Sequence, residues 1–275
     1  MPDPALDSIR NYYDYNTRLF LRFGSSRQVQ TIHRALWPAG VTSLAQALNI
    51  SNDMLLSVAR VTESQLIADL GCGVGATLFA LLEGLPEARG LGLTLSPVQA
   101  RLGARYAPPK ANLLEGDFQH LPLSTGFDLA YSIEAFVHAT RPEEYLAEAS
   151  RILRVGGRLA LIDDFLTRPE IDPASHAWLD VYQRGWHAPN LLPVTEVQSL
   201  AAQQGLRLLE DRDLTLLLRL RALPDLLAHT FLIISKPLWK AHPIIPSILG
   251  SMALQRLLRA RVISYRWLLF EKNVI

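Results

Sequence analysis

The segment Asp-Leu-Gly-Cys-Gly-Val-Gly-Ala at residues 69–76 constrains the fold of this chain more than any other. It follows a short apolar run at 66–70, and a segment of helical character at 76–83 comes after it. Glycines permit a tight turn and let the backbone approach a ligand closely. A buried strand, a glycine turn and a helix in this order predict the first unit of a parallel α/β sheet.

The same alternation of strands and helices continues along the chain. Apolar runs predict strands at 90–95, 112–117, 127–132, 158–163, 206–210 and 262–270, with helices among them at 97–106, 143–153 and 197–204. Strands that alternate with helices of about ten residues are typical of βαβ units. The predicted fold class is α/β: a Rossmann-like, mostly parallel sheet of seven strands with N-terminal helices and a C-terminal helical cap insertion.

Four parts are expected along the chain. Residues 1–60 have helical character, with Ser43 and Ser51 as expected helix caps, and form an N-terminal helical cap. Residues 61–221 form the core, and residues 261–275 supply its closing strand. Residues 222–260 are apolar and helix-like but are broken by four prolines. We interpret them as a helical substrate cap, and ordinary core packing is an equally good interpretation.

Composition narrows the class of protein. A net charge of +1 argues against a nucleic-acid binder, and the single cysteine excludes an internal disulfide and a multi-cysteine metal cluster. The N-terminus lacks the layout of a signal peptide, and no uninterrupted apolar run reaches the roughly 18 residues that span a bilayer. A cytoplasmic protein is expected, and a homo-oligomer is left open. Residues 219–270 mix apolar and basic side chains, for which a cap over a hydrophobic substrate is preferred to contact with a membrane surface.

The glycine loop is compatible with two kinds of cofactor. The loop satisfies the loose G-x-G-x-x-G/A pattern of dinucleotide sites, which also expect an acid at the end of the second strand. Here that strand ends Gly-Leu-Thr-Leu-Ser at 92–96, and an acid instead precedes the loop at Asp69. S-adenosylmethionine (SAM) carries no phosphate, and its ammonium and ribose hydroxyls call for carboxylates and hydroxyls. The residues around the loop therefore favour SAM over NAD or FAD.

Three stretches resemble the class I SAM-dependent methyltransferases. Residues 69–75 match the motif that wraps the methionine part of SAM in that family, Asp117 and Phe118 match the pair that holds the adenine, and 153–159 resemble the Gly-Gly turn into the fifth strand. Many members carry an acid for the ribose on the second strand. Here Thr94, with Ser96 and Gln99, must serve, as in a similar Gly-Leu-Thr-Leu-Ser-Pro-x-Gln stretch of the cyclopropane-synthase and tocopherol-methyltransferase branches. The resemblance implies a class I methyltransferase sheet whose cofactor contacts are Asp69, Gly71, Cys72, Gly73, Gly75, Thr94, Leu95, Gln99, Asp117, Phe118 and Ser132.

Residues 131–139, Tyr-Ser-Ile-Glu-Ala-Phe-Val-His-Ala, contain the expected catalytic groups. They resemble the Tyr-Ala-Ile-Glu-Ala segment, followed by a histidine, of sterol C-methyltransferases, and a similarly placed glutamate occurs in bacterial prenyl-diphosphate C-methyltransferases. An alkene that takes up a methyl group becomes a carbocation, which needs a negative charge nearby and a base for its proton. Glu134 is the candidate for both roles, with a helix N-terminal acid as the alternative. If this stretch is helical, His138 can orient Glu134. His138 can also carry the proton away, or it can have a structural role alone.

The resemblance implies a SAM-dependent C-methyltransferase that acts on an alkene carbon of an isoprenoid, either a prenyl diphosphate or a sterol-like lipid. A diphosphate would need Mg²⁺ and cationic side chains, although no residue is assigned as a metal ligand. The arginines available near the expected cap are Arg18, Arg22, Arg27 and Arg34. An O- or N-methyltransferase of a hydrophobic aromatic or quinol compound is the alternative, and a non-catalytic binding module the third. The expected substrate contacts are Tyr15, Trp186 and His187.

Overall fold

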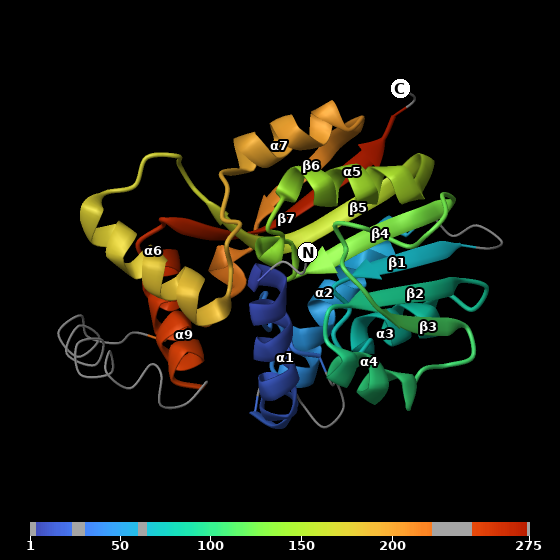
Figure 1. Cartoon of the computed structure of the whole chain (residues 1–275), viewed down its shortest axis with the longest axis horizontal. Helices are drawn as coiled ribbons and strands as arrows, with labels where there is room; N and C mark the ends of the chain where they lie inside the picture. The colour runs from blue at the N-terminus through green and yellow to red at the C-terminus, as the bar shows by residue number, and fades with distance from the viewer. Residues whose placement is uncertain (1–3, 24–30, 60–64, 222–243, 274–275) are drawn as a thin grey trace.

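The computed structural model describes residues 4–23, 31–59, 65–221 and 244–273 (Figure 1). Its centre is a seven-stranded sheet in the order β3-β2-β1-β4-β5-β7-β6. Strands β1 to β5 are parallel, and β7 runs antiparallel to both of its neighbours, β5 and β6. The predicted fold, a Rossmann-like and mostly parallel sheet of seven strands, is confirmed.

The strands lie where the apolar runs predict them, and β5 departs most from its predicted bounds. The strands are β1 Leu66–Leu70, β2 Arg89–Thr94, β3 Ala111–Glu115, β4 Phe127–Ile133, β5 Leu153–Leu166, β6 Leu206–Asp213 and β7 Ile263–Lys272. The pairing of β4 with β5 is irregular between Leu153 and Arg158, and Gly156 in this interval has a φ of 73°. The Gly-Gly turn is therefore a bulge inside the strand, whereas the sequence predicts a turn before it.

Helices cover both faces of the sheet (Figure 1). α2 (Leu44–Val58) and α3 (Ala76–Gly84) share one buried apolar cluster with the sheet, whereas α5 (Pro142–Ile152) and α7 (Val194–Gln203) share a second. α4 (Pro97–Ala104) packs along β2 and β3. Because the parallel strands are covered on both faces, they appear in the sequence as continuous apolar runs.

Three further helices gather beyond the carboxyl ends of β1, β2 and β4 (Figure 1): α1 (Pro4–Phe23), α6 (Pro173–Trp186) and α9 (Ile244–Arg259). α6 and α9 cross so closely that a Cβ built on Gly185 would lie 2.3 Å from the carbonyl oxygen of Pro246. Residues 222–243 of the predicted cap insertion lie outside the described residues. The described remainder of that insertion is α9, which joins α6 in one apolar cluster, and the division into domains stays a prediction.

In the described N-terminal residues, α1 is followed by the non-helical segment 31–43 and then by α2. Ser43 caps α2, since its side chain accepts a hydrogen bond from the backbone of Gln46 and the Gln46 side chain reaches back. The expected cap at Ser51 is wrong, because α2 continues through this residue and buries it completely. Ser51 lies on the same helix face as Leu48 and Leu55, and burial of that face overrides the preference of serine for a helix end.

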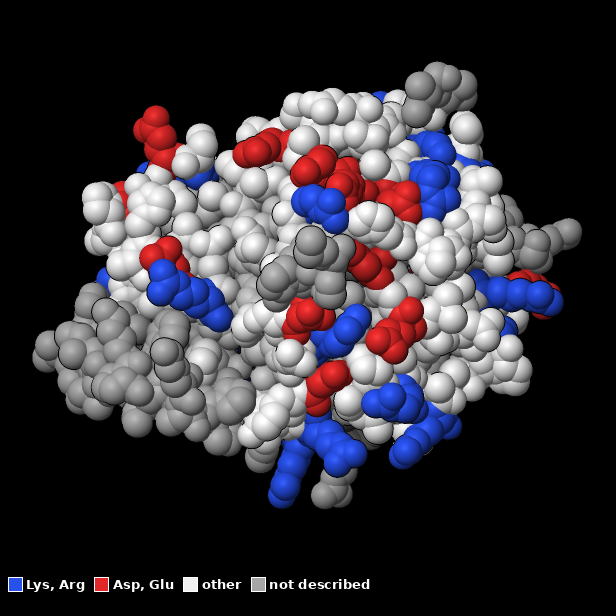
Figure 2. Space-filling view, in the orientation of Figure 1, with Lys and Arg blue, Asp and Glu red and all other residues white. Residues whose placement is uncertain are grey.

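The surface carries charges of both signs. Figure 2 shows acidic and basic side chains interspersed on one face of the molecule. Within the described ranges of the chain, no helix combines the length and the apolar composition that crossing a membrane requires.

Candidate active site

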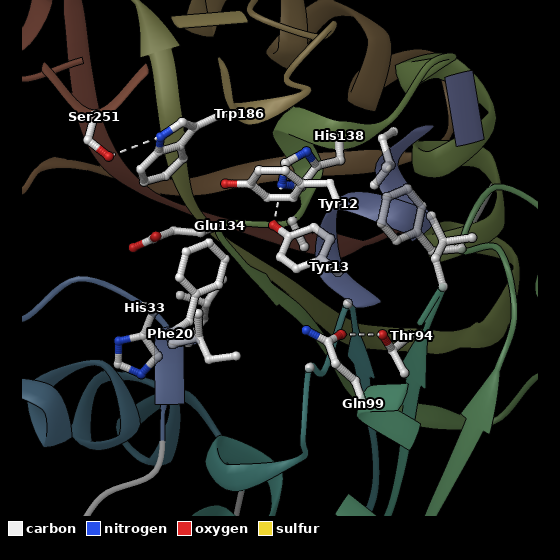
Figure 3. Close-up of a pocket in the computed structure, with 18 residues that line it drawn as sticks. Tyr12, Tyr13, Phe20, His33, Thr94, Gln99, Glu134, His138, Trp186 and Ser251 are labelled. Atoms are coloured by element: carbon white, nitrogen blue, oxygen red, sulfur yellow. Dashed lines mark hydrogen bonds between the residues drawn. The ribbon is translucent and has the colours of Figure 1, made fainter. Parts of the chain in front are cut away.

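A cavity of about 300 Å³ lies at the carboxyl edge of the sheet, bounded by α1, α6 and α9 (Figure 3). Ligands of open α/β folds bind at this edge, where the order of the strands reverses. A smaller cavity of about 60 Å³ adjoins it at Asp69 and Cys72, and both cavities are lined by Ile32, His33, Gly71, Gly73 and Ile133. The larger cavity is also lined by Ile9, Tyr12, Tyr13, Phe20, Thr94, Leu95, Gln99, Phe118, Glu134, Ala135, His138, Trp186 and Ser251.

The glycine loop forms the floor between the two cavities. Its glycines have φ values of 104° at Gly71, 56° at Gly73 and 84° at Gly75, a region that L-residues rarely adopt. A Cβ on Gly71 would lie 2.3 Å from the Cβ of Ala135, so this glycine is required by close packing. A Cβ on Gly73 would meet nothing closer than 3.9 Å. The space in front of Gly73 is therefore open to a ligand.

Asp69 is the carboxylate of the smaller cavity. It is 4% exposed and accepts a hydrogen bond of 2.8 Å from the hydroxyl of Tyr131. Burial raises the pKa of Asp69 to about 7, against the opposing effect of this hydrogen bond. A cation placed beside Asp69 would favour its charged form. Asp69 can thus hold the ammonium group of an amino-acid ligand.

The end of β2 presents an amide to the larger cavity. The Thr94 hydroxyl donates to Gln99 Oε1 over 2.7 Å, which leaves the Gln99 Nε2 group as a donor beside the open space at Gly73. Leu95 also lines this cavity. Ser96 does not line it, because the Ser96 hydroxyl donates to the carboxylate of Asp14 in α1. The Gln99 amide is thus available to a ligand, whereas Ser96 ties α1 to the start of α4; contact of Thr94 and Gln99 with a ribose stays a prediction.

Of the residues expected at the adenine, only Phe118 lines the larger cavity. The Asp117 carboxylate accepts a 2.9 Å hydrogen bond from the Gln119 backbone, and its contact with a cofactor stays a prediction. Ser132 is not placed as a cofactor ligand. Its hydroxyl donates to the Leu70 carbonyl over 2.6 Å and pairs with Tyr145, so it joins β4 to β1 beneath the loop.

Glu134 stands at the end of β4 and lines the larger cavity (Figure 3). One of its carboxylate oxygens, Oε1, accepts from the Arg34 backbone N–H over 2.7 Å, from Arg34 Nε over 3.0 Å and from the Tyr265 hydroxyl over 2.9 Å. The other oxygen, Oε2, accepts no hydrogen bond from the described residues. Among the described residues, the carboxylate is therefore held at Oε1 and has no donor at Oε2.

A buried ionic network holds this arrangement. Arg34 donates to both carboxylate oxygens of Asp164 over 2.9 and 3.0 Å, and its guanidinium lies 3.9 Å from the centre of the Tyr265 ring. Tyr182 donates to Asp164 over 2.8 Å. Burial alone would raise the pKa of Glu134, but the charge and the hydrogen bonds of Arg34 outweigh burial and lower it. Glu134 is therefore ionised at neutral pH.

His138 is not an orienting partner of Glu134. An α-helix does not form after Glu134, since the only helical residues there are the 3-10 turn Phe136–His138. The two ring nitrogens of His138 contact the His187 carbonyl at 2.9 Å and the Tyr13 hydroxyl at 2.6 Å. Burial lowers the pKa of His138 to about 4, so its imidazole is neutral at pH 7.

The aromatic lining differs in part from the predicted substrate contacts. Trp186 lines the larger cavity and donates to Ser247 and Ser251 of α9. Tyr15 is 52% exposed and does not line the cavity, and its contact with a substrate stays a prediction. His187 also lies outside the lining, against Tyr12 at 4.9 Å between ring centres. Lining residues that sequence reasoning missed include Ile9, Phe20, Ile32 and His33.

The helical pattern of α1 could have found two of these residues. Ile9, Tyr12, Tyr13 and Phe20 recur at the spacing of one helix face, and Tyr15 falls outside it. Ile32 and His33 belong to the non-helical segment between α1 and α2. No periodic pattern marks residues of such a segment, and their place in the cavity depends on contacts distant in the sequence.

Known proteins similar to this chain include methyltransferases. Residues 68–161 match the family model of the methyltransferase domain. The chain is similar to 24-methylenesterol C-methyltransferase 2 of Arabidopsis thaliana, with 29% identity over 61% of this chain and 48% of the relative. It is also similar to an O-methyltransferase of Pyrenophora dematioidea, with 31% identity over 58% of this chain and 61% of the relative. The match thus covers less than two thirds of the length of either relative.

Solved structures share the whole fold. A geranyl diphosphate C-methyltransferase from Streptomyces coelicolor A3(2) has a TM-score of 0.77 and 18% identity, covering 98% of both chains. The cyclopropane synthase MmaA2 from Mycobacterium tuberculosis also has a TM-score of 0.77, with 21% identity over 98% of this chain and 99% of that one. The [4+2]-cyclase SpnF is similar as well, with a TM-score of 0.74 and 18% identity over 97% and 96%. Residues 68–161 thus match a methyltransferase domain, and the chain shares the overall fold of these solved structures.

Proposed function

We propose that this protein transfers the methyl group of SAM to an alkene carbon of a hydrophobic isoprenoid. One observation carries the proposal: the cavity beside the glycine loop is walled by aromatic side chains. Among the described residues that line it, Glu134 is the only carboxylate, and its Oε2 atom accepts no hydrogen bond from them. Such a cavity suits an apolar molecule that becomes positively charged during its reaction.

The residues around the loop fit SAM. Asp69 would hold its ammonium group, the open face of Gly73 would accommodate its methionine part, and Gln99 would donate to its ribose. Bound there, SAM supplies an electrophilic methyl group next to the larger cavity. The same loop without an acid at the end of β2 is a poor match for a dinucleotide.

Glu134 and the aromatic walls account for the remaining steps. The π bond of the alkene forms the new C–C bond while the methyl–sulfur bond breaks, so no base is needed first. The positive charge left on the neighbouring carbon is stabilised by Glu134 and by the rings of Tyr12, Phe20 and Trp186, each ring by about 0.5–2 kcal/mol. Glu134 Oε2 then takes a proton from an adjacent carbon, and the C–H electrons restore a double bond.

The names of similar proteins support an isoprenoid acceptor, since these proteins include sterol and geranyl diphosphate C-methyltransferases. Mg²⁺ appears beside geranyl diphosphate in the latter structure. In the described residues of this chain, however, no three histidine, cysteine or acidic side chains are grouped to hold a metal ion. The described residues therefore do not form a Mg²⁺ site, and the proposed reaction has no step that uses this ion.

A phenol or quinol O-methyltransferase is the second candidate. The observation that favours it is the pair formed by Tyr13 and the neutral imidazole of His138, which together could pass a proton from a substrate hydroxyl. O-methyltransferases also occur among the relatives. In this reaction Glu134 would act on the hydroxyl rather than on a carbocation.

Incubation with methyl-labelled SAM and three acceptor classes tests the proposal. The acceptors are isoprenoid alkenes, phenols with a prenyl chain, and simple phenols, and the products are analysed by mass spectrometry and NMR. We expect label on carbon in the isoprenoid alkenes alone. Label on oxygen would establish the second candidate instead. The Gly73→Val variant, in which a side chain fills the open face of the loop, is the negative control.

A further inference from the structure

A buried tyrosine stands beside the carboxylate of Asp69 in the smaller cavity. Asp69 belongs to β1, and Tyr131 is its partner in the register of β1 with β4. Because successive side chains of a strand point to opposite faces, residues that are paired in register project from the same face of the sheet. Asp69 and Tyr131 both line the smaller cavity. The pairing of the two strands thus sets the tyrosine next to the carboxylate.

Tyr131 holds one oxygen of this carboxylate. Its hydroxyl donates to Asp69 Oδ2 over 2.8 Å, and its side chain is fully buried. The ring packs in the first apolar cluster with Ile67 and Leu129, so it cannot turn away from Asp69 without opening the core. No other described residue donates a hydrogen bond to Asp69. Among the described residues, Oδ2 is therefore held and Oδ1 has no donor.

No fixed cation stands beside Asp69 among the described residues that line the smaller cavity, since none of them is lysine or arginine. The titratable groups near Asp69 are Cys72 in the loop, Tyr131 in β4, Tyr145 in α5 and His33 in the segment between α1 and α2. Burial raises the pKa of the thiol and of both phenols and lowers the pKa of His33, so all four groups are neutral at pH 7. The hydrogen bond from Tyr131 is then the contact within the described chain that favours the charged form of Asp69.

We propose that Tyr131 is a positioning residue of the cofactor site, whose hydroxyl holds Asp69 by Oδ2 so that Oδ1 meets the ammonium group of SAM. This inference rests on the proposed function, in which Asp69 holds that ammonium group. Tyr131 acts through Asp69, because its own proton is already donated to the carboxylate. A tyrosine that only filled the core would contribute to folding and would not change how strongly the ammonium group is bound.

Two ligands separate a positioning role from a structural one: S-adenosylhomocysteine and its analogue without the α-amino group. The ratio of their affinities, measured by calorimetry at pH 7, reports what the ammonium group adds to binding. We expect a ratio of about 10-fold or more in the wild type, the value of a hydrogen bond to a charged group.

The Tyr131→Phe variant keeps the ring and removes the hydroxyl. We expect the ratio of affinities to fall about 5-fold, because loss of the hydrogen bond raises the pKa of Asp69 from about 7 by about one unit and leaves less of it charged at pH 7. A loss of packing alone would weaken both ligands equally. An unchanged ratio in Tyr131→Phe would therefore overturn the inference.

The dependence on pH is a second readout. The affinity for S-adenosylhomocysteine should rise between pH 5.5 and 7.5 as Asp69 becomes charged, a range in which the α-amino group of the ligand keeps most of its proton. The Tyr131 hydrogen bond lowers the pKa of Asp69, so the curve of Tyr131→Phe should lie about one pH unit higher. The analogue without the amino group should show neither the rise nor the displacement. A curve that stays in place would contradict the role of the hydroxyl.

Tyr145→Phe is the matched control. Tyr145 is equally buried, but its hydroxyl pairs with Ser132 and its ring belongs to the second apolar cluster. Loss of this hydroxyl should leave the ratio and the pH curve unchanged. Asp69→Asn is a second test variant: it should reduce the ratio by itself, and in its background Tyr131→Phe should reduce the ratio no further. A full further reduction there would refute an action through Asp69.

The proposed function and this inference can fail separately. A wild-type ratio in Asp69→Asn would refute the placement of the cofactor's ammonium group at Asp69. A ratio that falls in Asp69→Asn and not in Tyr131→Phe would refute the inference alone. Reduced ratios in both variants, without methyl transfer from SAM to any isoprenoid, would refute the proposed acceptor and keep the inference.

Discussion

The Glu134→Gln substitution tests the carboxylate on which the proposed reaction depends. The amide oxygen of glutamine can still accept the hydrogen bonds that Arg34 and Tyr265 donate to Oε1, and the amide nitrogen replaces the free Oε2. The change therefore removes a charge and a basic oxygen while keeping the shape. Asp164 still pairs with Arg34 through two hydrogen bonds, so the buried cation keeps a partner.

The expected loss of turnover is large. A positioned base contributes about 10²–10⁴-fold, which corresponds to roughly 3–5.5 kcal/mol of transition-state stabilisation. The expected loss of folding stability is smaller, on the order of 1–3 kcal/mol for a charge-assisted hydrogen bond that becomes neutral. This contribution is present above the unfolded pKa of glutamate. It is lost as the pH falls through the lower pKa of folded Glu134.

Steady-state rates at several pH values, with the affinity for SAM measured by calorimetry, provide the assay. We expect unchanged SAM binding and a low rate that does not recover at high pH. The control is Glu143→Gln at an exposed position in the first turn of α5, which should behave as the wild type. Full activity of Glu134→Gln at neutral pH would remove Glu134 from the mechanism. Recovery toward pH ~10, where a phenol ionises by itself, would refute the carbocation role and favour O-methylation.

Three more substitutions test the site and its walls. Gly73→Val places a branched side chain at a φ of 56° in the open face of the loop, and calorimetry should show SAM binding lost. The affinity of wild-type protein for SAM should rise between pH 5.5 and 7.5, because the pKa of Asp69 is about 7 and a cationic ligand favours the charged carboxylate. The Asp69→Asn variant should bind SAM more weakly and without this pH dependence. Gly185→Ala should lower the melting temperature although alanine favours helices, because its Cβ would lie 2.3 Å from the Pro246 carbonyl oxygen; an unchanged melting temperature would contradict the close crossing of α6 and α9.

The parts of the fold that local patterns determine were predictable from the sequence. β1 and the glycine loop have their predicted bounds, because an apolar run and a cluster of glycines each have few structural alternatives. The Ser43 cap was predictable for the same reason, since its partner Gln46 lies three residues away. Ser51 was not, because its burial depends on the surface that α2 packs against.

The location of the site, at the carboxyl edge of the sheet, was predictable from the sequence. Thr94 ends β2, Gln99 lies in the helix that follows it, and Glu134 follows β4; the carboxyl ends of these strands meet at one edge, and all three residues line the cavity. The residues that donate hydrogen bonds to Glu134 could not be identified from the sequence. Arg34 precedes Glu134 by 100 residues, and the sequence shows it only as one of four arginines near the expected cap. A contact between such distant residues follows from the folded chain and from no local pattern.

The backbone at Glu134 gives an independent reason to assign the carboxylate a role in the cavity. Glu134 has a φ of 53°, in the left-handed region, which costs a non-glycine residue about 1–2 kcal/mol. Its N–H donates to the Ile162 carbonyl over 2.8 Å, so the strained residue is also held in the sheet. A glycine would adopt this conformation without strain if only a turn were needed here. The contacts of the side chain therefore explain why a glutamate, and not a glycine, occupies this position. Its Oε1 atom accepts hydrogen bonds from Arg34 and Tyr265, and its Oε2 atom stays available to the cavity.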